Sequence, residues 1–180
     1  MTTFSQRLQS LYARRPDRVA VTLQFPGRDD LPITYDQLLA GANRYALALE
    51  CEGIEPGEVV ILILQHGEDL IYAFWGAILQ GTIPSIMPFL TEKLSPERYQ
   101  ADLSALISVT QPAAIVTFPE FEGDVRSALK EGDSVRSILV TDHIESQAEL
   151  NFAISKVSSE PQKILPYYNI LLGRPACKKV

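Results

Sequence analysis

An uninterrupted apolar run, VVILIL at residues 59–64, is the feature that most restricts how this chain can fold. A strand with one face in water alternates apolar and polar residues, whereas a continuous run is typical of a strand covered on both faces. Two further runs, AAIVTF at 113–118 and SILVT at 137–141, have the same character. Parallel strands with helices on both faces meet this requirement, so the three runs predict an α/β fold.

A helix with clear end signals precedes the first run. Thr34-x-x-Gln37 can form a capping box, and Gly53 can take the left-handed conformation that ends a helix. We therefore expect a helix from Thr34 to about Glu52. Its apolar stripe consists of Leu38, Leu39, Ala42, Ala46 and Leu49.

The remaining segments alternate in the same way. We expect a short amphipathic helix before Pro16, a strand over 18–25, and a turn at GRDD, in an order of helix, strand pair, then repeated helix and strand. Residues 70–80 are apolar almost all round and predict a buried helix that ends at Gly81, followed by a short strand over 83–87. Ser95 and Pro96 predict the start of a helix that ends before Pro112, and a further helix is expected over 119–130. The whole pattern predicts alternating helices around a mostly parallel sheet.

Charge and hydropathy exclude several classes of partner. The net charge is −6 and the sequence pI is about 4.9, so the chain has no overall basic field for nucleic acid or for an anionic membrane surface. The sequence has no uninterrupted apolar run of the roughly 18 residues that a membrane span needs. The polar start MTTFSQRLQSLYARRP lacks the apolar block of a signal peptide, so we expect a cytoplasmic protein.

Few side chains suggest chemistry. His66 comes just after a buried strand, where parallel sheets often carry ligands, and it is a minor candidate for a catalytic role. Glu68 and Asp69 could be imagined as an acid–base pair, but acidic residues at a helix start favour the helix dipole, and we adopt that interpretation. His143 is expected to be solvated.

The aromatic residues Tyr72, Phe74 and Trp75 are expected to pack in the core rather than to form a cofactor cage. Arg14 and Arg15 form a short charge cluster that is expected to be solvated, as is the CKK cluster at 177–179.

Three segments together resemble the N-terminal part of the adenylate-forming (AMP-binding) superfamily, especially the fatty acyl-AMP ligases and acyl-CoA synthetases. They are ITYDQLLAGANRYALAL at 33–49, the segment from GIEPGEVVILIL to GTIPSIMPFL at 53–90, and LSPERYQADLSALISVTQPAAIVT at 94–117. Each is weak alone, and the resemblance depends on their order and spacing over about Phe4–Leu150. After GTIPSI the sequence departs from the family pattern, so no residue is assigned to an acyl pocket.

The resemblance implies an activity for an intact parent enzyme. Such enzymes activate a fatty or other carboxylic acid with ATP and Mg²⁺, release pyrophosphate, and pass the acyl group to coenzyme A or a carrier-protein thiol. Their phosphate loop, Ser-Ser-Gly-Thr-Thr-Gly-x-x-Lys-Gly, closes backbone N–H groups on phosphate oxygens. This loop is absent from the 180 residues, so we assign no catalytic, cofactor-binding or metal-binding residue and expect no adenylation by this chain alone.

The last twenty residues, PQKILPYYNILLGRPACKKV, suggest why the loop is absent. One permitted set of codons for 161–180, read from one base earlier, encodes Ala-Ser-Glu-Asp-Ile-Ala-Leu-Leu-Gln-Tyr-Ser-Ser-Gly-Thr-Thr-Gly-Leu-Gln-Lys-Gly. In that reading only the first base of each codon is freely chosen. We therefore expect residues 1–153 to be a partial N-terminal subdomain and 154–180 to be a non-homologous tail translated after a frameshift between about Ala153 and Glu160.

Two other hypotheses stay open. The chain could be a complete small α/β binding or interaction module whose tail is native. It could instead be one piece of a split adenylating enzyme that needs a separately translated remainder. The acid substrate, the thiol acceptor and the oligomeric state are left open.

Overall fold

The computed structural model describes residues 3–90 and 95–144 of the 180-residue chain. Two helices that flank a hairpin come first: helix α1 (Phe4–Arg14), the hairpin strands β1 (Val19–Leu23) and β2 (Leu31–Thr34), and helix α2 (Tyr35–Cys51). Strands and helices then alternate through β3 (Val59–Ile63), α3 (Glu68–Gln80), β4 (Ile83–Ile86), α4 (Pro96–Thr110) and β5 (Ala114–Thr117). The 3-10 turn η1 (Pro119–Phe121), helix α5 (Glu122–Ala128) and strand β6 (Ser137–Val140) complete the order. The predicted α/β fold is confirmed.

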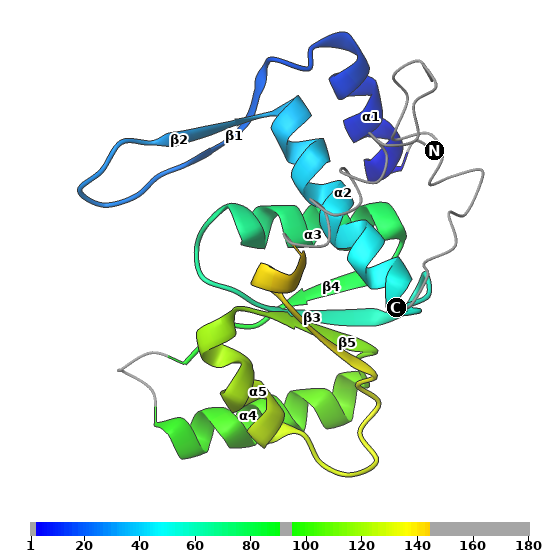
Figure 1. The fold of residues 1–180 in the computed structure, drawn as a ribbon, viewed down its shortest axis with the longest axis vertical. Helices are drawn as coiled ribbons and strands as arrows, with labels where there is room; N and C mark the ends of the chain where they lie inside the picture. Colours follow the sequence, from blue (N-terminus) through cyan, green and yellow to red (C-terminus); the bar gives the residue numbers. More distant parts are fainter. Residues whose placement is uncertain (1–2, 91–94, 145–180) are drawn as a thin grey trace.

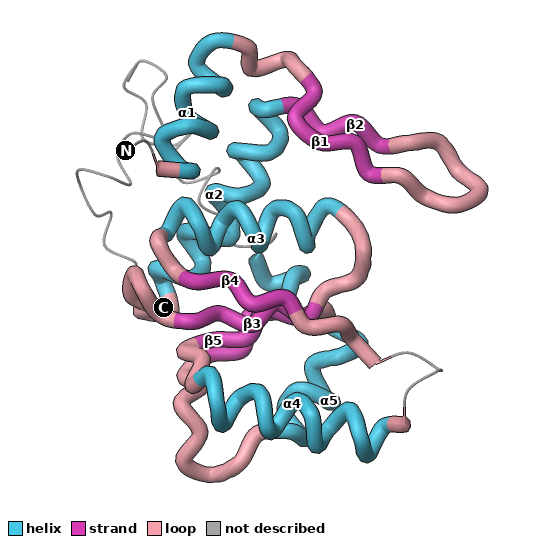
Figure 2. Tube along the Cα trace, turned by 180° about the vertical axis from the view of Figure 1, so that it is seen from behind, coloured by secondary structure: helices cyan, strands magenta, loops and turns pink. Residues whose placement is uncertain are grey.

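The four strands β3 to β6 form one parallel sheet in the order β4-β3-β5-β6. Helices α1, α2 and α3 lie on one side of this sheet, and α4 and α5 lie on the other (Figure 1; Figure 2 shows the reverse side). Strands β1 and β2 form a separate antiparallel hairpin that projects from the body of the molecule. The sheet is therefore the middle layer of a helix–sheet–helix sandwich.

Two hydrophobic cores fill the spaces on the two sides of the sheet. The continuous apolar run of β3 serves both, because successive side chains of a strand point to opposite faces. Val60 and Leu62 enter the core under α2 and α3, whereas Ile61 and Ile63 enter the core under α4 and α5. All four are completely buried, which confirms the prediction of a strand covered on both faces.

Local signals position the helices as expected. Thr34 caps α2: its Oγ1 accepts from the N–H of Gln37 at 3.2 Å, while Gln37 Oε1 accepts from the N–H of Thr34 at 2.8 Å. Helix α3 ends at Gly81, which has φ +95° and donates its N–H to the carbonyl of Ala77. Ser95 caps α4 as predicted, through its Oγ and the N–H of Arg98.

One helix is shorter than the sequence predicts. The segment 119–130 begins as a 3-10 turn, and its α-helical part ends at Ala128 because Leu129 adopts an extended conformation, with ψ 144°. The carboxylate of Asp133 then accepts the N–H of Lys130 at 2.7 Å and closes the following turn. The predicted tail 154–180, including the CKK cluster, lies outside the described residues.

Helices α2 and α3 approach each other closely through glycines. A methyl group on Gly76 of α3 would come within 2.6 Å of the Ala42 carbonyl oxygen and of the Tyr45 Cβ. A methyl group on Gly41 of α2 would meet the ring of Tyr72 in the same way. Bare backbone is therefore required on both sides of this helix pair. No helix within the described ranges has the length and apolarity that a membrane crossing requires.

Candidate functional site

The order of the strands identifies one end of the sheet as the candidate site. The chain moves outward from β3 to β4, then returns past β3 to β5 and continues outward to β6. The connection that leaves β3 and the one that leaves β5 therefore run in opposite directions along the sheet, which makes the gap between β3 and β5 a topological switch point. In open α/β sheets, ligands bind at such a switch point, outside the carboxyl ends of the strands. We define the carboxyl edge by the residues that follow β3, β4 and β5: Gln65–His66, Met87–Pro88 and Phe118.

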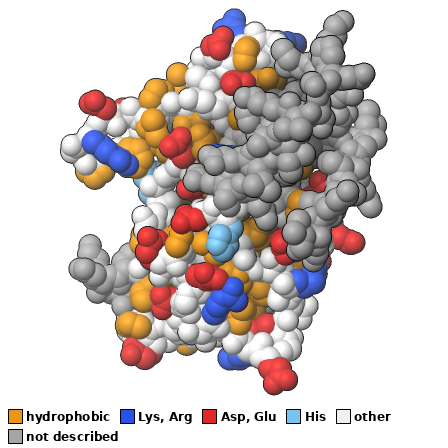
Figure 3. Space-filling view, viewed as in Figure 1, with side chains coloured by type: hydrophobic (Ala, Val, Ile, Leu, Met, Phe, Trp, Pro, Cys, Tyr) orange, Lys and Arg blue, Asp and Glu red, His pale blue; other side chains and the backbone are white. Residues whose placement is uncertain are grey.

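The hairpin contributes one wall of the carboxyl edge. Phe25, just after β1, packs edge-on against the ring of His66, with 5.6 Å between the ring centroids. The guanidinium of Arg28 lies over the ring of Phe25, 3.5 Å from its centroid. Figure 3 shows the surface recessed below the projecting hairpin. His66 is thus placed at the edge that the sequence predicts, exposed and in contact with an aromatic ring from a distant segment.

Aromatic side chains close the α4 side of the carboxyl edge. The rings of Phe118 and Phe121 stack with centroids 5.6 Å apart, and Phe89 packs edge-on against Phe118 at 5.7 Å. Tyr99 of α4 packs against Phe121 and donates its hydroxyl to the carbonyl of Pro88 at 2.8 Å. The cluster supplies a largely apolar wall, and its one hydroxyl, that of Tyr99, is bonded to the backbone.

Thr117, the last residue of β5, is a buried polar group at the same edge. It is completely buried, and within the described ranges its Oγ1 has no hydrogen-bond partner. A buried hydroxyl without a partner costs free energy. Thr117 is thus a polar residue in an otherwise apolar wall.

The acidic start of α3 is structural. Asp69 Oδ1 accepts from the hydroxyl of Tyr45 at 2.6 Å, and Glu68 Oε1 accepts from the hydroxyl of Tyr72 at 2.9 Å. Both carboxylates lie in the first helical turn, as the dipole interpretation expects. The sequence did not reveal their second function, which is to bond the tyrosines of the α2–α3 interface.

The predicted packing of the aromatic residues of α3 is confirmed. Tyr72 belongs to the first core, and Phe74 and Trp75 are partly buried against it. His143 is exposed, as expected, in the helical turn that follows β6. Within residues 3–90 and 95–144, no group of three or more His, Cys, Asp or Glu side chains is arranged to hold a metal ion.

Two tyrosines make the stability of the fold sensitive to alkali. Burial, helped by the hydrogen bond to Glu68, raises the pKa of Tyr72 to about 12, and burial with the nearby charge of Asp124 raises the pKa of Tyr99 to about 12. The folded state therefore favours both neutral phenols. This stabilisation is complete below the unfolded pKa near 10 and is lost as the pH rises from about 10 to about 12.

We expect the free energy of unfolding, measured by urea titration at several pH values, to fall steeply over that interval. Tyr99→Phe should make the fall shallower, because phenylalanine keeps the ring packing but cannot ionise. An unchanged slope in Tyr99→Phe would show that the neutral phenol is not favoured by the fold.

The contact between Phe25 and His66 predicts how firmly the hairpin is held. A two-stranded hairpin is only marginally stable by itself in water. Phe25→Ala removes the ring that contacts both His66 and Arg28, so we expect trypsin to cleave after Arg28 at least several-fold faster. Phe4→Ala is the matched control, since Phe4 is 75% exposed on α1 and lies outside the hairpin. Equal cleavage rates in the two variants would contradict this anchoring role.

The comparisons with known proteins agree with this architecture. The family model of AMP-binding enzymes matches residues 8–173. A protein of Schizosaccharomyces pombe is 29% identical over 177 residues, covering 88% of this chain and 12% of that protein. The fatty acid AMP ligase from Legionella pneumophila has a similar structure, with a TM-score of 0.63 and 20% identity over 91% of this chain and 26% of that chain. A benzoate CoA ligase from Burkholderia xenovorans LB400 is also similar, with a TM-score of 0.62 and 23% identity over 83% of this chain and 28% of that chain.

The structure is an α/β domain, and the family match over 8–173 places it in the adenylate-forming class. The chain belongs to the AMP-binding enzyme family. It spans about a quarter of the two solved chains described above and a smaller share of the S. pombe relative. The family match runs on to residue 173 and so does not mark the predicted boundary between residues 153 and 154, which stays a prediction.

Proposed function

We propose that this chain is the N-terminal part of a fatty acyl-AMP ligase or acyl-CoA synthetase, and that the 180 residues do not catalyse adenylation alone. The intact parent would join the carboxylate of a fatty or other acid to the α-phosphate of ATP and release pyrophosphate. A coenzyme A or carrier-protein thiol would then receive the acyl group. The observation that carries the proposal is the family match over 8–173 on a parallel sheet of this strand order.

We propose that ATP and Mg²⁺ are held by parts of the parent enzyme other than the described residues. The carboxyl edge is walled by Phe118, Phe121 and Phe89 and has an exposed His66, but the described ranges contain no glycine-rich phosphate loop. They also contain no cluster of three or more potential metal ligands. A phosphate loop acts through preorganised N–H donors; in oxyanion holes, which use the same principle, the loss of one donor costs about 3 kcal/mol of transition-state stabilisation. We therefore assign to this part of the chain a structural wall and no chemical step.

The proposal places the missing loop in the neighbouring reading frame of residues 161–180. This placement is supported by the order of the motif in the shifted reading, in which a strand-like Asp-Ile-Ala-Leu-Leu-Gln-Tyr precedes Ser-Ser-Gly-Thr-Thr-Gly. In family members this loop follows the strand that corresponds to SILVT by a few tens of residues. The spacing from Val140 to the shifted motif agrees with that distance.

Pyrophosphate exchange into ATP tests the proposal. The purified 180-residue chain, assayed with fatty acids of several lengths, should give no exchange above a heat-denatured control. Turnover above that control would overturn the assignment of inactivity. Activity that returns on coexpression with a separately translated remainder would instead support the split-enzyme hypothesis.

A further inference from the structure

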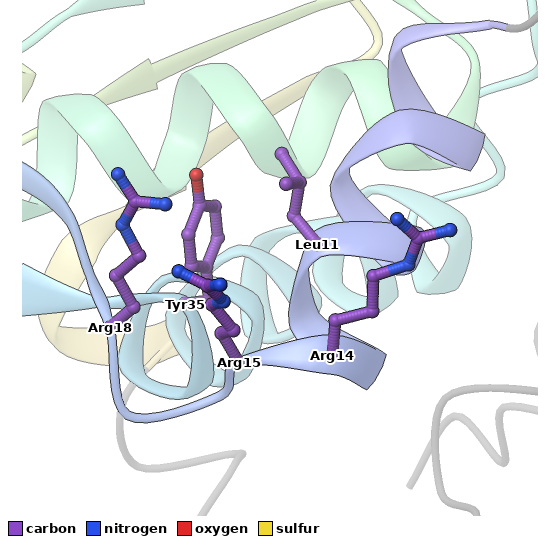
Figure 4. Close-up of a pocket in the computed structure, with 5 residues that line it drawn as sticks. All are labelled: Leu11, Arg14, Arg15, Arg18 and Tyr35. Carbon is purple, nitrogen blue, oxygen red and sulfur yellow. The ribbon is translucent and has the colours of Figure 1, made fainter.

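We propose that a hollow lined by three arginines, remote in the fold from the carboxyl edge, binds a small phosphate-bearing anion. The hollow has a volume of about 260 Å³ and is lined by Leu11, Arg14, Arg15, Arg18 and Tyr35 (Figure 4). Leu11 and Arg14 come from α1, Arg15 and Arg18 from the turn between α1 and β1, and Tyr35 from the first residue of α2. We call it the arginine hollow. This proposal does not depend on the proposed function.

Backbone hydrogen bonds hold the turn that carries the arginines. Arg15 ends α1 and donates its N–H to the carbonyl of Leu11 at 3.0 Å, and Arg18 donates its N–H to the carbonyl of Arg15 at 3.2 Å. The start of α2 is tied to the same turn, because Tyr35 donates its N–H to the carbonyl of Arg18 and Asp36 to that of Pro16, both at 3.0 Å. The backbone under the guanidinium groups is therefore fixed before any ligand arrives.

The charge of the arginine hollow is not balanced by carboxylates of the described residues. Among the described residues, the ion pairs to acidic side chains are made by Arg98, Arg126 and Arg136, which do not line the hollow. Asp17 and Asp36 are the acidic neighbours in sequence, and neither is joined to the hollow by any of these ion pairs. Arg14 is in the last turn of α1 and Arg15 is its C-cap, where cations favour the helix dipole, whereas Arg18 lies beyond the helix. The dipole thus does not account for Arg18.

The donors of the hollow match the chemistry of a phosphate group. Each guanidinium presents a planar fork of N–H donors that pairs with two oxygens of one anion, and charge-assisted bonds of this kind are stronger than neutral ones. Figure 4 shows the hydroxyl end of Tyr35 pointing toward the same side as the guanidinium of Arg18. The same view places the guanidinium of Arg14 on the far side of Leu11 from those of Arg15 and Arg18. Two guanidinium groups and a phenol, with a third cation farther along α1, suit a multiply charged anion with several oxygens better than a single carboxylate.

Calorimetric titration of the full chain with inorganic pyrophosphate at low ionic strength tests the proposal. We expect saturable one-to-one binding that weakens about tenfold in Arg18→Gln and in Arg15→Gln, because a tenfold change is about 1.4 kcal/mol, near the low end for one hydrogen bond to a charged group. Arg98→Gln is the matched control, an exposed arginine on α4, and should bind as the parent does. Added salt should weaken the parent's binding more than that of Arg18→Gln.

Each variant is checked by circular dichroism and thermal unfolding, because the bond from Tyr35 to Arg18 uses only backbone atoms and should survive the substitution. Absence of saturable binding by the folded parent would overturn the proposal. Equal weakening in Arg98→Gln would show a non-specific charge effect and also overturn it. Succinate binding as tightly as pyrophosphate, with the same dependence on Arg18, would replace the phosphate assignment by a carboxylate one.

Discussion

Gly76→Ala is expected to lower the free energy of unfolding by about 3 kcal/mol, a large part of the 5–15 kcal/mol typical of a domain. Alanine normally stabilises a helix interior relative to glycine by about 1 kcal/mol. Here the added methyl group would come within 2.6 Å of the Ala42 carbonyl oxygen and 3.1 Å of the Ala46 nitrogen. These are backbone atoms of α2 and cannot move aside independently, so the two helices must separate.

Separation of α2 and α3 would also disturb their polar contacts. Tyr45 is only 2% exposed and its hydroxyl donates to Asp69 across the interface, so a shift of α3 weakens both burial and hydrogen bonding. Gly41→Ala should act on the same interface through the ring of Tyr72. The cost is measured by urea unfolding followed by circular dichroism.

Gly123→Ala is the control for this prediction. Gly123 is inside α5, and a methyl group there would meet no atom within 4 Å. We expect this variant to be as stable as the parent or more stable by up to about 1 kcal/mol. Parent-like stability of Gly76→Ala would mean that α2 and α3 are not packed as closely as the structure has them.

Restoring the neighbouring reading frame should create adenylation activity that we do not expect from the 180-residue chain. In the restored protein, residues 161–180 are replaced by the shifted reading and its continuation. The glycines of Ser-Ser-Gly-Thr-Thr-Gly would allow backbone N–H groups to approach phosphate oxygens, and the lysine would offset the charge that develops on the leaving pyrophosphate. The rate of pyrophosphate exchange into ATP should therefore rise from the level of a heat-denatured control to a clearly measurable enzymatic rate.

A matched variant separates catalysis from simple folding. Replacement of the lysine of the shifted reading by alanine should keep the restored protein folded while lowering exchange by about a hundredfold or more. If the restored protein is folded and still inactive, the proposal that this region carries the parent's phosphate loop is wrong. Exchange activity in the unaltered 180-residue chain would contradict the proposal that these residues do not catalyse adenylation alone.

Much of the fold follows from local patterns in the sequence. The capping box of Thr34 and Gln37, the continuous run of β3 and the left-handed Gly81 each depend on residues close in the chain, and the structure confirms all three. The end of α5 was missed because Leu129 becomes extended where periodicity alone would continue a helix. Strand order could not be derived from the runs, because each is equally apolar and equally suited to a central strand.

The candidate sites were less predictable, because they depend on long-range contacts. His66 was placed at the end of β3 from sequence, but its contact with Phe25 arises only when the hairpin folds over the carboxyl edge. Arg14 and Arg15 are exposed, as predicted, but the arginine hollow that they line forms only because the turn after α1 is bonded to the start of α2. The small residues Gly41 and Gly76 were the available signal for the close helix contact.

The most direct test of the central claim is the nucleotide sequence of the gene from codon 150 to beyond codon 180. The account predicts that the frame one base earlier encodes Ser-Ser-Gly-Thr-Thr-Gly-x-x-Lys-Gly opposite residues 171–180 and continues as an open adenylate-forming enzyme. A neighbouring frame that lacks this motif, or that closes at once with stop codons, would contradict it.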